Sequence, residues 1–338
     1  MRRGLVLAAL LASTALLTAP AMAAGYKFEK VGTIKLPGKP GHGDIVTYDP
    51  SNKMIYVSLV DDGLAVVDTR TNKVVHYIQN VPSPNGNDAD ANYVYVACAD
   101  GPGAGKVNAI AVISKKTWKE VARVTTKGTS PDWIEADPKN HLVYTTSDDN
   151  NWIEVYTSGA KPAFKAKWPL YPPKGGPDVA ILLEHKHRIF QSVDSWLDEV
   201  NTNTGAVVGH VDTHVKLTKK GGTKDFAYDA AHNRLWNGTT TGGMWVWNPD
   251  TLTVIKKLPE KGQGVDQVGY DPKLGLVYAF DGGAKGVDAY DANAMTYAGF
   301  LPTGVGLTHS GTVDTDTHVV YAYAGDAGAL MLFKPVKE

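Results

Sequence analysis

Acidic residues recur in this sequence at a constant distance before an aromatic residue. The aromatic residues span the whole chain: Tyr56, Tyr95, Tyr144, Phe190, Trp236, Tyr278 and Tyr321. In five of the seven cases the position twelve residues earlier holds an aspartate or a histidine: Asp44, Asp132, Asp178, Asp266 and His309. In the other two an acid lies nearby, since Asp225 is eleven residues before Trp236, and Asp88 follows Ser83, the twelfth residue before Tyr95. Carboxylates and imidazoles in such numbers could bind a cation or exchange protons.

Two histidines at the ends of this series suggest a metal site. His42 lies two residues before Asp44, and His309 belongs to the last repeat. Carboxylate oxygens suit a hard divalent cation, and a histidine ligand shifts the preference toward Zn, Mn, Fe or Cu. We therefore predict His42, Asp44 and His309 as ligands of a divalent metal whose identity stays open.

The remaining residues of interest are predicted to face a small ligand. They are Asp88, Asp132, Asp178, Asp225, Asp266 and, as a pocket wall, Trp196. Structural alternatives stay open, because an Asp at the start of a strand can accept backbone N–H bonds or tie neighbouring units together. An aromatic residue near a strand end, such as Trp196, is often part of the core. The loop residue Asp148 should open on the same face, but Asp is also a common turn former.

The spacing of the aromatic residues predicts the fold that would bring these side chains together. Successive gaps are 39, 49, 46, 46, 42 and 43 residues. A period of about 40–50 residues with four short strands per unit is typical of a β-propeller, whose innermost strands line a channel. We therefore predict an all-β, seven-bladed β-propeller. The last unit lacks a fourth strand, and we expect the spare strand at Tyr26–Leu36 to complete it and cover its edge.

The turns between strands resemble those of a known family. The segment "YDPSNKMIYVSLVDDGLAVVDTRTNKVV" is similar to the YVTN-repeat family of bacterial periplasmic seven-bladed propellers in its "DP" turn, "YVS" strand and "VVDTRTNKVV" strand-turn-strand. The resemblance implies the fold but no single activity, because this and neighbouring groups include binding proteins, accessory factors, lyases and lactonases. Where the family usually has Pro-x-Gly before the innermost strand, this chain has "GHGDIV", "SPDWIE" and "GPDVAI".

The first residues predict export. Arg2 and Arg3 precede a short apolar stretch at residues 4–17, and "AMA" at residues 21–23 has the form of a signal-peptidase site. We therefore predict a signal peptide at residues 1–23, a single propeller domain at 24–338 and a periplasmic location. The apolar stretch is shorter than the ~20 residues that span a bilayer, so no membrane insertion is expected after the signal is removed.

Composition argues against several partners and cofactors. The formal net charge is −1, which gives no support to nucleic acid as a partner. Cys98 is the only cysteine, so a c-type haem is not expected. The glycine-rich segment "DGPGAGK" lacks the spacing of a phosphate-binding loop, so no nucleotide cofactor is expected.

Together these features predict a periplasmic β-propeller that binds a small ligand or divalent metal at one mouth of its channel, as an accessory or binding protein. Its partner would be a small molecule or another periplasmic protein. One alternative is a metal-dependent lyase or lactonase in which the cation polarises a carbonyl or activates water, although the catalytic residues stay unknown. The other alternative is a scaffold for protein interactions.

Overall fold

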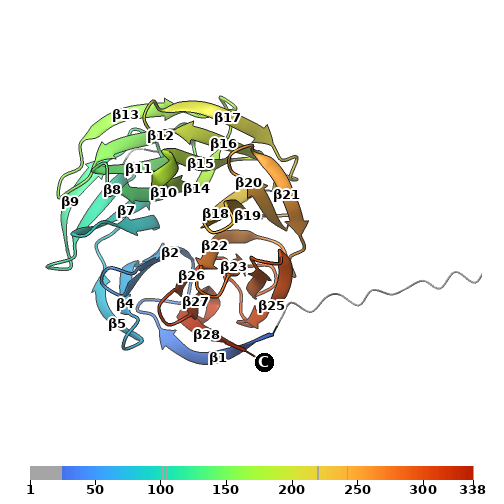
Figure 1. Ribbon diagram of the computed structural model, residues 1–338. Coiled ribbons are helices and arrows are strands. Elements are labelled where there is room, and N and C mark those ends of the chain that lie inside the picture. The colour runs from blue at the N-terminus through green and yellow to red at the C-terminus, as the bar shows by residue number, and fades with distance from the viewer. Residues whose placement is uncertain (1–24, 101–102, 104, 219–220, 242, 338) are drawn as a thin grey trace, which may run out of the picture.

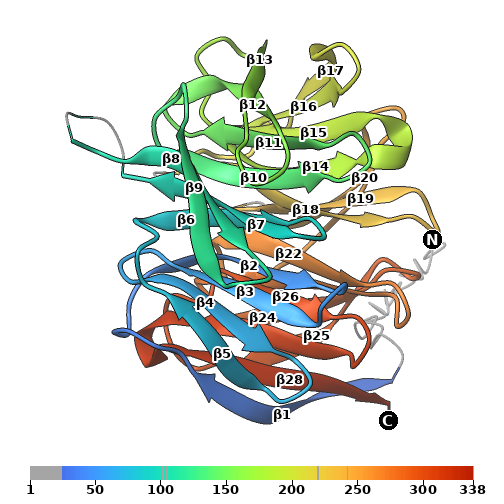
Figure 2. The ribbon, with the colours of Figure 1, turned by 90° about the vertical axis from the view of Figure 1, so that its left-hand side faces the viewer.

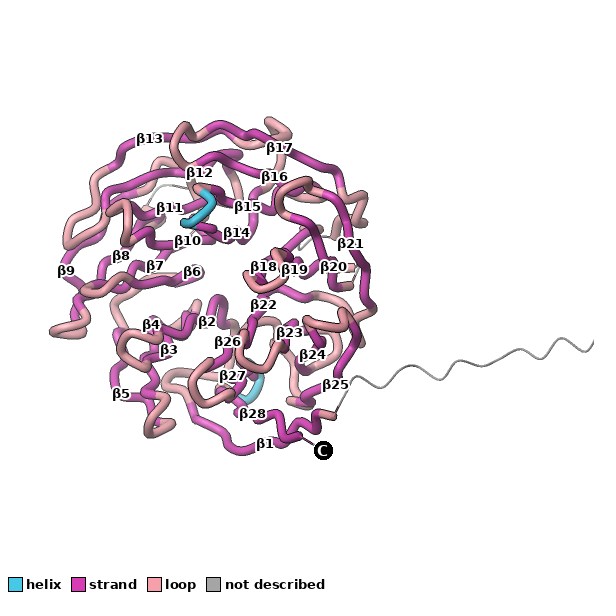
Figure 3. The backbone as a smooth tube through the Cα atoms, in the orientation of Figure 1, coloured by secondary structure: helices cyan, strands magenta, loops and turns pink. Residues whose placement is uncertain are grey.

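The chain folds into a ring of antiparallel β-sheets around a central axis (Figure 1). The computed structural model describes residues 25–337 except 101–102, 104, 219–220 and 242, and in these residues it has seven sheets of four strands each. The backbone tube shows strands over most of this chain and two short 3-10 helices, η1 (Glu184–Lys186) and η2 (Gly325–Ala327) (Figure 3). The prediction of an all-β, seven-bladed propeller is confirmed. The predicted signal peptide at residues 1–23 lies outside the described residues.

Each blade runs from an innermost strand beside the axis to an outermost strand at the rim. Blades one to four are β2 (Gly43–Asp49), β3 (Met54–Leu59), β4 (Gly63–Asp68) and β5 (Lys73–Ile78); β6 (Pro84–Ala89), β7 (Tyr93–Ala99), β8 (Asn108–Ser114) and β9 (Lys119–Thr125); β10 (Pro131–Asp137), β11 (Leu142–Ser147), β12 (Asn150–Thr157) and β13 (Phe164–Pro169); β14 (Pro177–Leu183), β15 (Arg188–Val193), β16 (Trp196–Asn201) and β17 (Ala206–Asp212). Blades five to seven are β18 (Thr223–Asp229), β19 (Arg234–Thr239), β20 (Met244–Asn248) and β21 (Thr253–Leu258); β22 (Val265–Asp271), β23 (Leu276–Asp281), β24 (Gly286–Asp291) and β25 (Thr296–Pro302); β26 (Gly311–Asp314), β27 (Val319–Ala324), β28 (Ala329–Lys337) and β1 (Tyr26–Lys35).

The seventh blade joins the first and last described strands. β1 pairs antiparallel with β28 from Tyr26 opposite Lys337 to Lys35 opposite Ala329. Figure 2 shows the two strands side by side along one edge of the molecule, blue against red. Ile34 and Leu36 are buried in a core cluster shared with the first blade, so the closing strand also contributes apolar burial. The predicted closure of the last blade by the N-terminal strand is confirmed.

The aromatic residues that mark the repeat are fully buried on the second strand of each blade. Six of the seven pair with the residue nine positions earlier, as Tyr56 does with Thr47 of β2 and Tyr144 with Glu135 of β10. Tyr95 pairs with Asp88, seven positions earlier. The Tyr56 hydroxyl donates to Asp49 Oδ2 at 2.8 Å, at the far end of the innermost strand. Because each ring is fixed in the core and its strand is in register with the innermost strand, residues the same distance before it reach the same level of the channel.

Two further features bear on the predictions from composition. Cys98 is fully buried on β7, and burial raises the pKa of its thiol to about 12, so it is an unreactive core thiol. None of the helices in the described part of the chain has the length and apolar character needed to cross a membrane.

Candidate functional site

A repeated backbone hydrogen bond defines equivalent positions in the seven blades. The amide just beyond the second strand donates to a carbonyl just before the innermost strand, as Val60 N does to His42 O at 3.1 Å and Thr240 N to Gly222 O at 2.9 Å. Two residues after that carbonyl the blades carry, in chain order, Asp44, Asn85, Asp132, Asp178, Lys224, Asp266 and His309. We call these seven residues the mouth ring.

The mouth ring surrounds a cavity of about 270 Å³ at one end of the channel. All seven ring residues line it, together with His42, Asp148 and a few small or apolar residues. In the described part of this lining there are five carboxylates, those of Asp44, Asp132, Asp148, Asp178 and Asp266, and one ammonium group, that of Lys224. The cavity therefore has a strong excess of negative charge when its acids are ionised.

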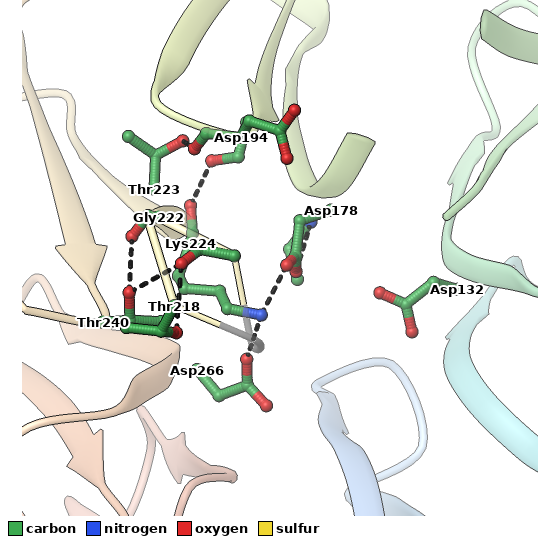
Figure 4. Close-up of polar contacts among 12 residues, drawn as sticks. Asp132, Asp178, Asp194, Thr218, Gly222, Thr223, Lys224, Thr240 and Asp266 are labelled. Atoms are coloured by element: carbon green, nitrogen blue, oxygen red, sulfur yellow. Dashed lines mark hydrogen bonds and ion pairs between the residues drawn. The ribbon is translucent and has the colours of Figure 1, made fainter. Parts of the chain in front are cut away.

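Lys224 of blade five bridges the carboxylates of the two neighbouring blades. Its Nζ pairs with Asp178 Oδ2 and lies 2.9 Å from Asp266 Oδ1, and Figure 4 shows the side chain reaching between them. Burial alone would lower the pKa of Lys224, but the two carboxylates outweigh it and raise that pKa well above its usual value. Burial alone would likewise raise the pKa of Asp266, but Lys224 and His309 hold it well below its usual range. This side of the ring is therefore charge-compensated.

The histidines of the ring lie beside this network. His309 Nδ1 is 2.9 Å from Asp266 Oδ2 and 3.0 Å from the hydroxyl of Ser310, and its side chain is largely buried. The ring of His42 is exposed and tilted by 33° to that of His309, with 5.4 Å between centroids. His42, Asp44 and His309, the predicted metal ligands, thus all line the mouth cavity. Within the residues that the structure describes, no group of three or more His, Cys, Asp or Glu is placed to hold a metal ion as it stands.

The opposite side of the ring has no lysine or arginine among its described residues. Asp132 accepts one hydrogen bond, from Asn85 Nδ2 at 3.2 Å, and Figure 4 shows it standing apart from the Lys224 network. The carboxylate of Asp44 receives no hydrogen bond from any described residue. Burial and the charge of Asp266 raise the pKa of Asp44, and burial with the charge of Asp148 raises that of Asp132 well above its usual value. Asp148 keeps part of its surface exposed, yet loss of hydration and the charge of Asp178 raise its pKa to about 8.

A second cavity of about 200 Å³ lies further along the innermost strands. The carboxylates that line it accept hydrogen bonds from backbone amides. Asp88 accepts from Ala136 N at 2.8 Å, Glu135 from Leu182 N at 3.0 Å, and Asp225 from Val268 N at 3.0 Å. Each bond runs from one blade to the innermost strand of the next blade. Burial raises the pKa of Asp88 to about 6 and that of Asp225 to about 7. These three residues, which we call the inner tier, tie neighbouring blades together.

The structure thus divides the predicted ligand residues among three places. Asp132, Asp178 and Asp266 line the mouth cavity; Asp88 and Asp225 line the second one. Trp196 lines neither cavity, as the described residues define them. It begins β16, the third strand of its blade, and its ring packs against Tyr171 at a centroid distance of 4.8 Å and against His210 at 5.7 Å.

Four of the residues described above are absent from the predicted set. Lys224 lies twelve residues before Trp236, so the same count finds it once a basic residue is accepted there. Asn85 is hidden because β6 and the turn after it are together two residues shorter than β2 and its turn. Asp148 is expected on the face of the channel mouth but is also a common turn former, and Glu135 resembles an ordinary polar residue of an alternating strand.

The fold and the mouth ring define a β-propeller with an acidic channel mouth. No family model and no curated protein matches the sequence. Among solved structures the chain is similar to a chain of Kuenenia stuttgartiensis hydrazine synthase, with a TM-score of 0.74, 16% identity, and 90% of this chain and 97% of that chain covered. At this identity the likeness shows the β-propeller fold alone.

Proposed function

We propose that this protein is a periplasmic binding protein that holds a small cationic ligand in the cavity of the mouth ring. The observation that carries the proposal is the imbalance of the described lining, with five carboxylates against the ammonium of Lys224. The imbalance is concentrated at Asp44, Asp132 and Asp148, because Lys224 already compensates Asp178 and Asp266. A cation placed among the three would complete the charge pattern of the ring.

The electrostatics of the mouth favour such a ligand. Carboxylates held close together in a partly dehydrated cavity resist ionisation, and a bound cation relieves this resistance. Burial raises the pKa values of Asp44 and Asp132, and the pKa of Asp148, about 8, means that protons occupy part of this site near neutral pH. Cation binding would displace those protons, so affinity is expected to rise between about pH 6 and pH 8, as Asp148 loses its proton.

Calorimetry with simple cations tests the proposal. We expect saturable binding of at least one probe among n-butylammonium, tetramethylammonium, Mg²⁺ and Zn²⁺, with net proton release shown by the dependence of the heat on the buffer. Asp132→Asn should weaken it about 10-fold or more, on the scale of one charge-assisted hydrogen bond. Glu29→Gln is the control, because Glu29 is an exposed acid of β1 that pairs only with Lys27 among the described residues. Failure of every probe at pH 8 would overturn the proposal.

A divalent metal is the second candidate, and the two histidines favour it. His42 and His309 lie 5.4 Å apart between ring centroids and line the same cavity as Asp44. These three residues would hold the ion, and the metal would supply Lewis acidity for a lyase or lactonase reaction. Metal content after loading with Zn²⁺ or Mn²⁺, compared among wild type, His42→Ala and His309→Ala, separates this candidate from an organic cation. Equal metal content in all three proteins would exclude these ligands.

The periplasmic location rests on the predicted signal peptide at residues 1–23. Fractionation of cells that express the full chain tests it, with Arg2→Glu/Arg3→Glu as the variant that removes the basic start. Processing near Ala24 and recovery in the periplasmic fraction are expected for the natural sequence. Retention of the unprocessed chain in the cytoplasm would contradict it.

A further inference from the structure

The mouth ring contains the same arrangement twice. Read in blade order, its first six residues form two triplets, Asp44–Asn85–Asp132 from blades one to three and Asp178–Lys224–Asp266 from blades four to six. The seventh position, His309, separates them on one side. Each triplet has an aspartate on both flanking blades, and the two triplets differ in the residue at the centre.

The second triplet shows what this arrangement holds. Its central residue is lysine, and the ammonium group lies between the two flanking carboxylates, 2.9 Å from Asp266 Oδ1 and paired with Asp178 Oδ2. The side chain of Lys224 is 9% exposed, so the ammonium is nearly enclosed. A primary ammonium has three N–H donors and can therefore bond to two carboxylates at once. We call this the filled triplet.

The first triplet has the same flanks without the cation. Its central residue, Asn85, is much shorter than lysine and donates to Asp132 alone, at 3.2 Å. The carboxylate of Asp44 receives no hydrogen bond from the described residues, and Asp148 adds a further carboxylate from the loop after β11. All of these residues line the cavity of about 270 Å³, which is enough for a few methylene groups. We call this the open triplet.

We infer that the open triplet binds the primary ammonium group of a small alkylamine, over Asn85 and between Asp44 and Asp132, in the place that the Lys224 ammonium takes in the filled triplet. The inference rests on the proposed cation site and names the chemical class of its ligand. A quaternary ammonium has no N–H donor and cannot reproduce the contacts of Lys224. A divalent ion prefers oxygen ligands, but the amide of Asn85 directs its nitrogen donor toward Asp132.

The decisive experiment moves the lysine from one triplet to the other. In Asn85→Lys a tethered ammonium would fill the open triplet, so n-butylammonium binding should fall at least about 100-fold, and the midpoint of thermal unfolding should rise. Asn85→Met adds similar bulk without charge, and it should weaken n-butylammonium without raising the midpoint. Asp44→Asn should weaken n-butylammonium about 10- to 100-fold through loss of a charge-assisted hydrogen bond.

The outcomes separate this inference from the broader proposal. Tight binding of n-butylammonium with weak or absent binding of tetramethylammonium, abolished in Asn85→Lys, supports the inference. Binding of Mg²⁺ or Zn²⁺ without n-butylammonium leaves a cation site but overturns the amine. Equal affinity for n-butylammonium and tetramethylammonium overturns it as well. Unchanged n-butylammonium affinity in a folded Asn85→Lys protein places any amine site elsewhere.

Discussion

Carboxylates line the channel of this propeller at two levels, and the two levels differ in what their oxygens contact. In the mouth ring, Asp178 and Asp266 contact a lysine from another blade, and Asp44 lines the mouth cavity together with His42 and His309. In the inner tier, each carboxylate accepts a hydrogen bond from a backbone amide on the innermost strand of the next blade; the three residues are Asp88, Glu135 and Asp225.

Burial and an elevated pKa do not by themselves mark a binding residue. Asp225 of the inner tier and Asp132 of the mouth ring both resist ionisation because they are buried. Their partners differ, because Asp225 accepts a hydrogen bond from the backbone of the next blade, whereas Asp132 accepts one only from the side chain of Asn85, among the described residues, and lines the mouth cavity. Substitutions at the two levels should therefore have opposite effects on stability and binding.

The largest effect is expected from Lys224→Met. This change leaves the partly buried carboxylates of Asp178 and Asp266 without the Lys224 ammonium, so the free energy of unfolding at pH 7.5 should fall by about 3–5 kcal/mol. Urea unfolding followed by tryptophan fluorescence measures it. The loss should shrink at pH 4.5, where Asp178 can take up a proton, while an equal loss at both pH values would point to packing instead of charge.

A pair of variants at Asp225 tests the structural role of the inner tier. Asp225→Ala leaves the buried amide of Val268 without an acceptor and should cost about 1–3 kcal/mol. Asp225→Asn keeps an acceptor oxygen and removes the charge, so its stability should stay within about 0.5 kcal/mol of wild type. Both variants should bind n-butylammonium as wild type does. A loss of binding in Asp225→Asn would erase the distinction between the two levels.

The sequence accounts for the fold and for most of the mouth ring, for one physical reason. Tyr56, Trp236 and their counterparts are core residues in fixed register with the innermost strand, so a constant count along the chain reaches a constant level of the channel. The count fails at Asn85 because the hairpin before Tyr95 is two residues shorter.

The division between the two levels could not be predicted from the sequence. Whether Asp225 faces a ligand or the amide of Val268 depends on the spacing between neighbouring blades, and no local pattern encodes that distance. The pairing of Lys224 with acids 46 residues before it and 42 after it has the same origin. The sequence also does not show how far Trp196 lies from the channel. This residue begins the third strand of its blade and packs against Tyr171, away from the channel.

Asp132→Asn tests whether Asp132 of the mouth ring contributes to cation binding or to the stability of the fold. The change removes one of several repelling carboxylates and keeps an oxygen, so stability at pH 8 should rise by at most about 1 kcal/mol while cation affinity falls. Urea unfolding and calorimetry on the same preparation give both numbers. A gain in stability with loss of binding is the opposite of the pattern expected for Asp225→Ala. Loss of stability in Asp132→Asn would instead assign this residue to the fold.

The pH dependence of the unfolding temperature tests both levels of the channel in one measurement. The pKa values of Asp88, Asp225 and Asp148 are raised to about 6, about 7 and about 8, from an ordinary value of 3.8. Between about pH 4 and pH 8 the folded chain therefore holds protons that the unfolded chain has released. The stability from these groups is complete near pH 4 and is lost as the pH rises through the three values.

Adding a cation should change the contribution of the mouth ring to this pH dependence and leave the contribution of the inner tier unchanged. Saturating n-butylammonium compensates the ionised acids of the mouth, so it should flatten the decline near pH 8, as Asp148→Asn does. It should leave the contributions of Asp88 and Asp225 to the decline near pH 6–7 unchanged, and Asp225→Asn should remove the Asp225 contribution. Thermal unfolding from pH 4.5 to pH 8.5 with and without the amine measures both. If the amine flattened the whole profile equally, the inner tier and the mouth ring would be one coupled site, because a cation at one level would then control ionisation at the other.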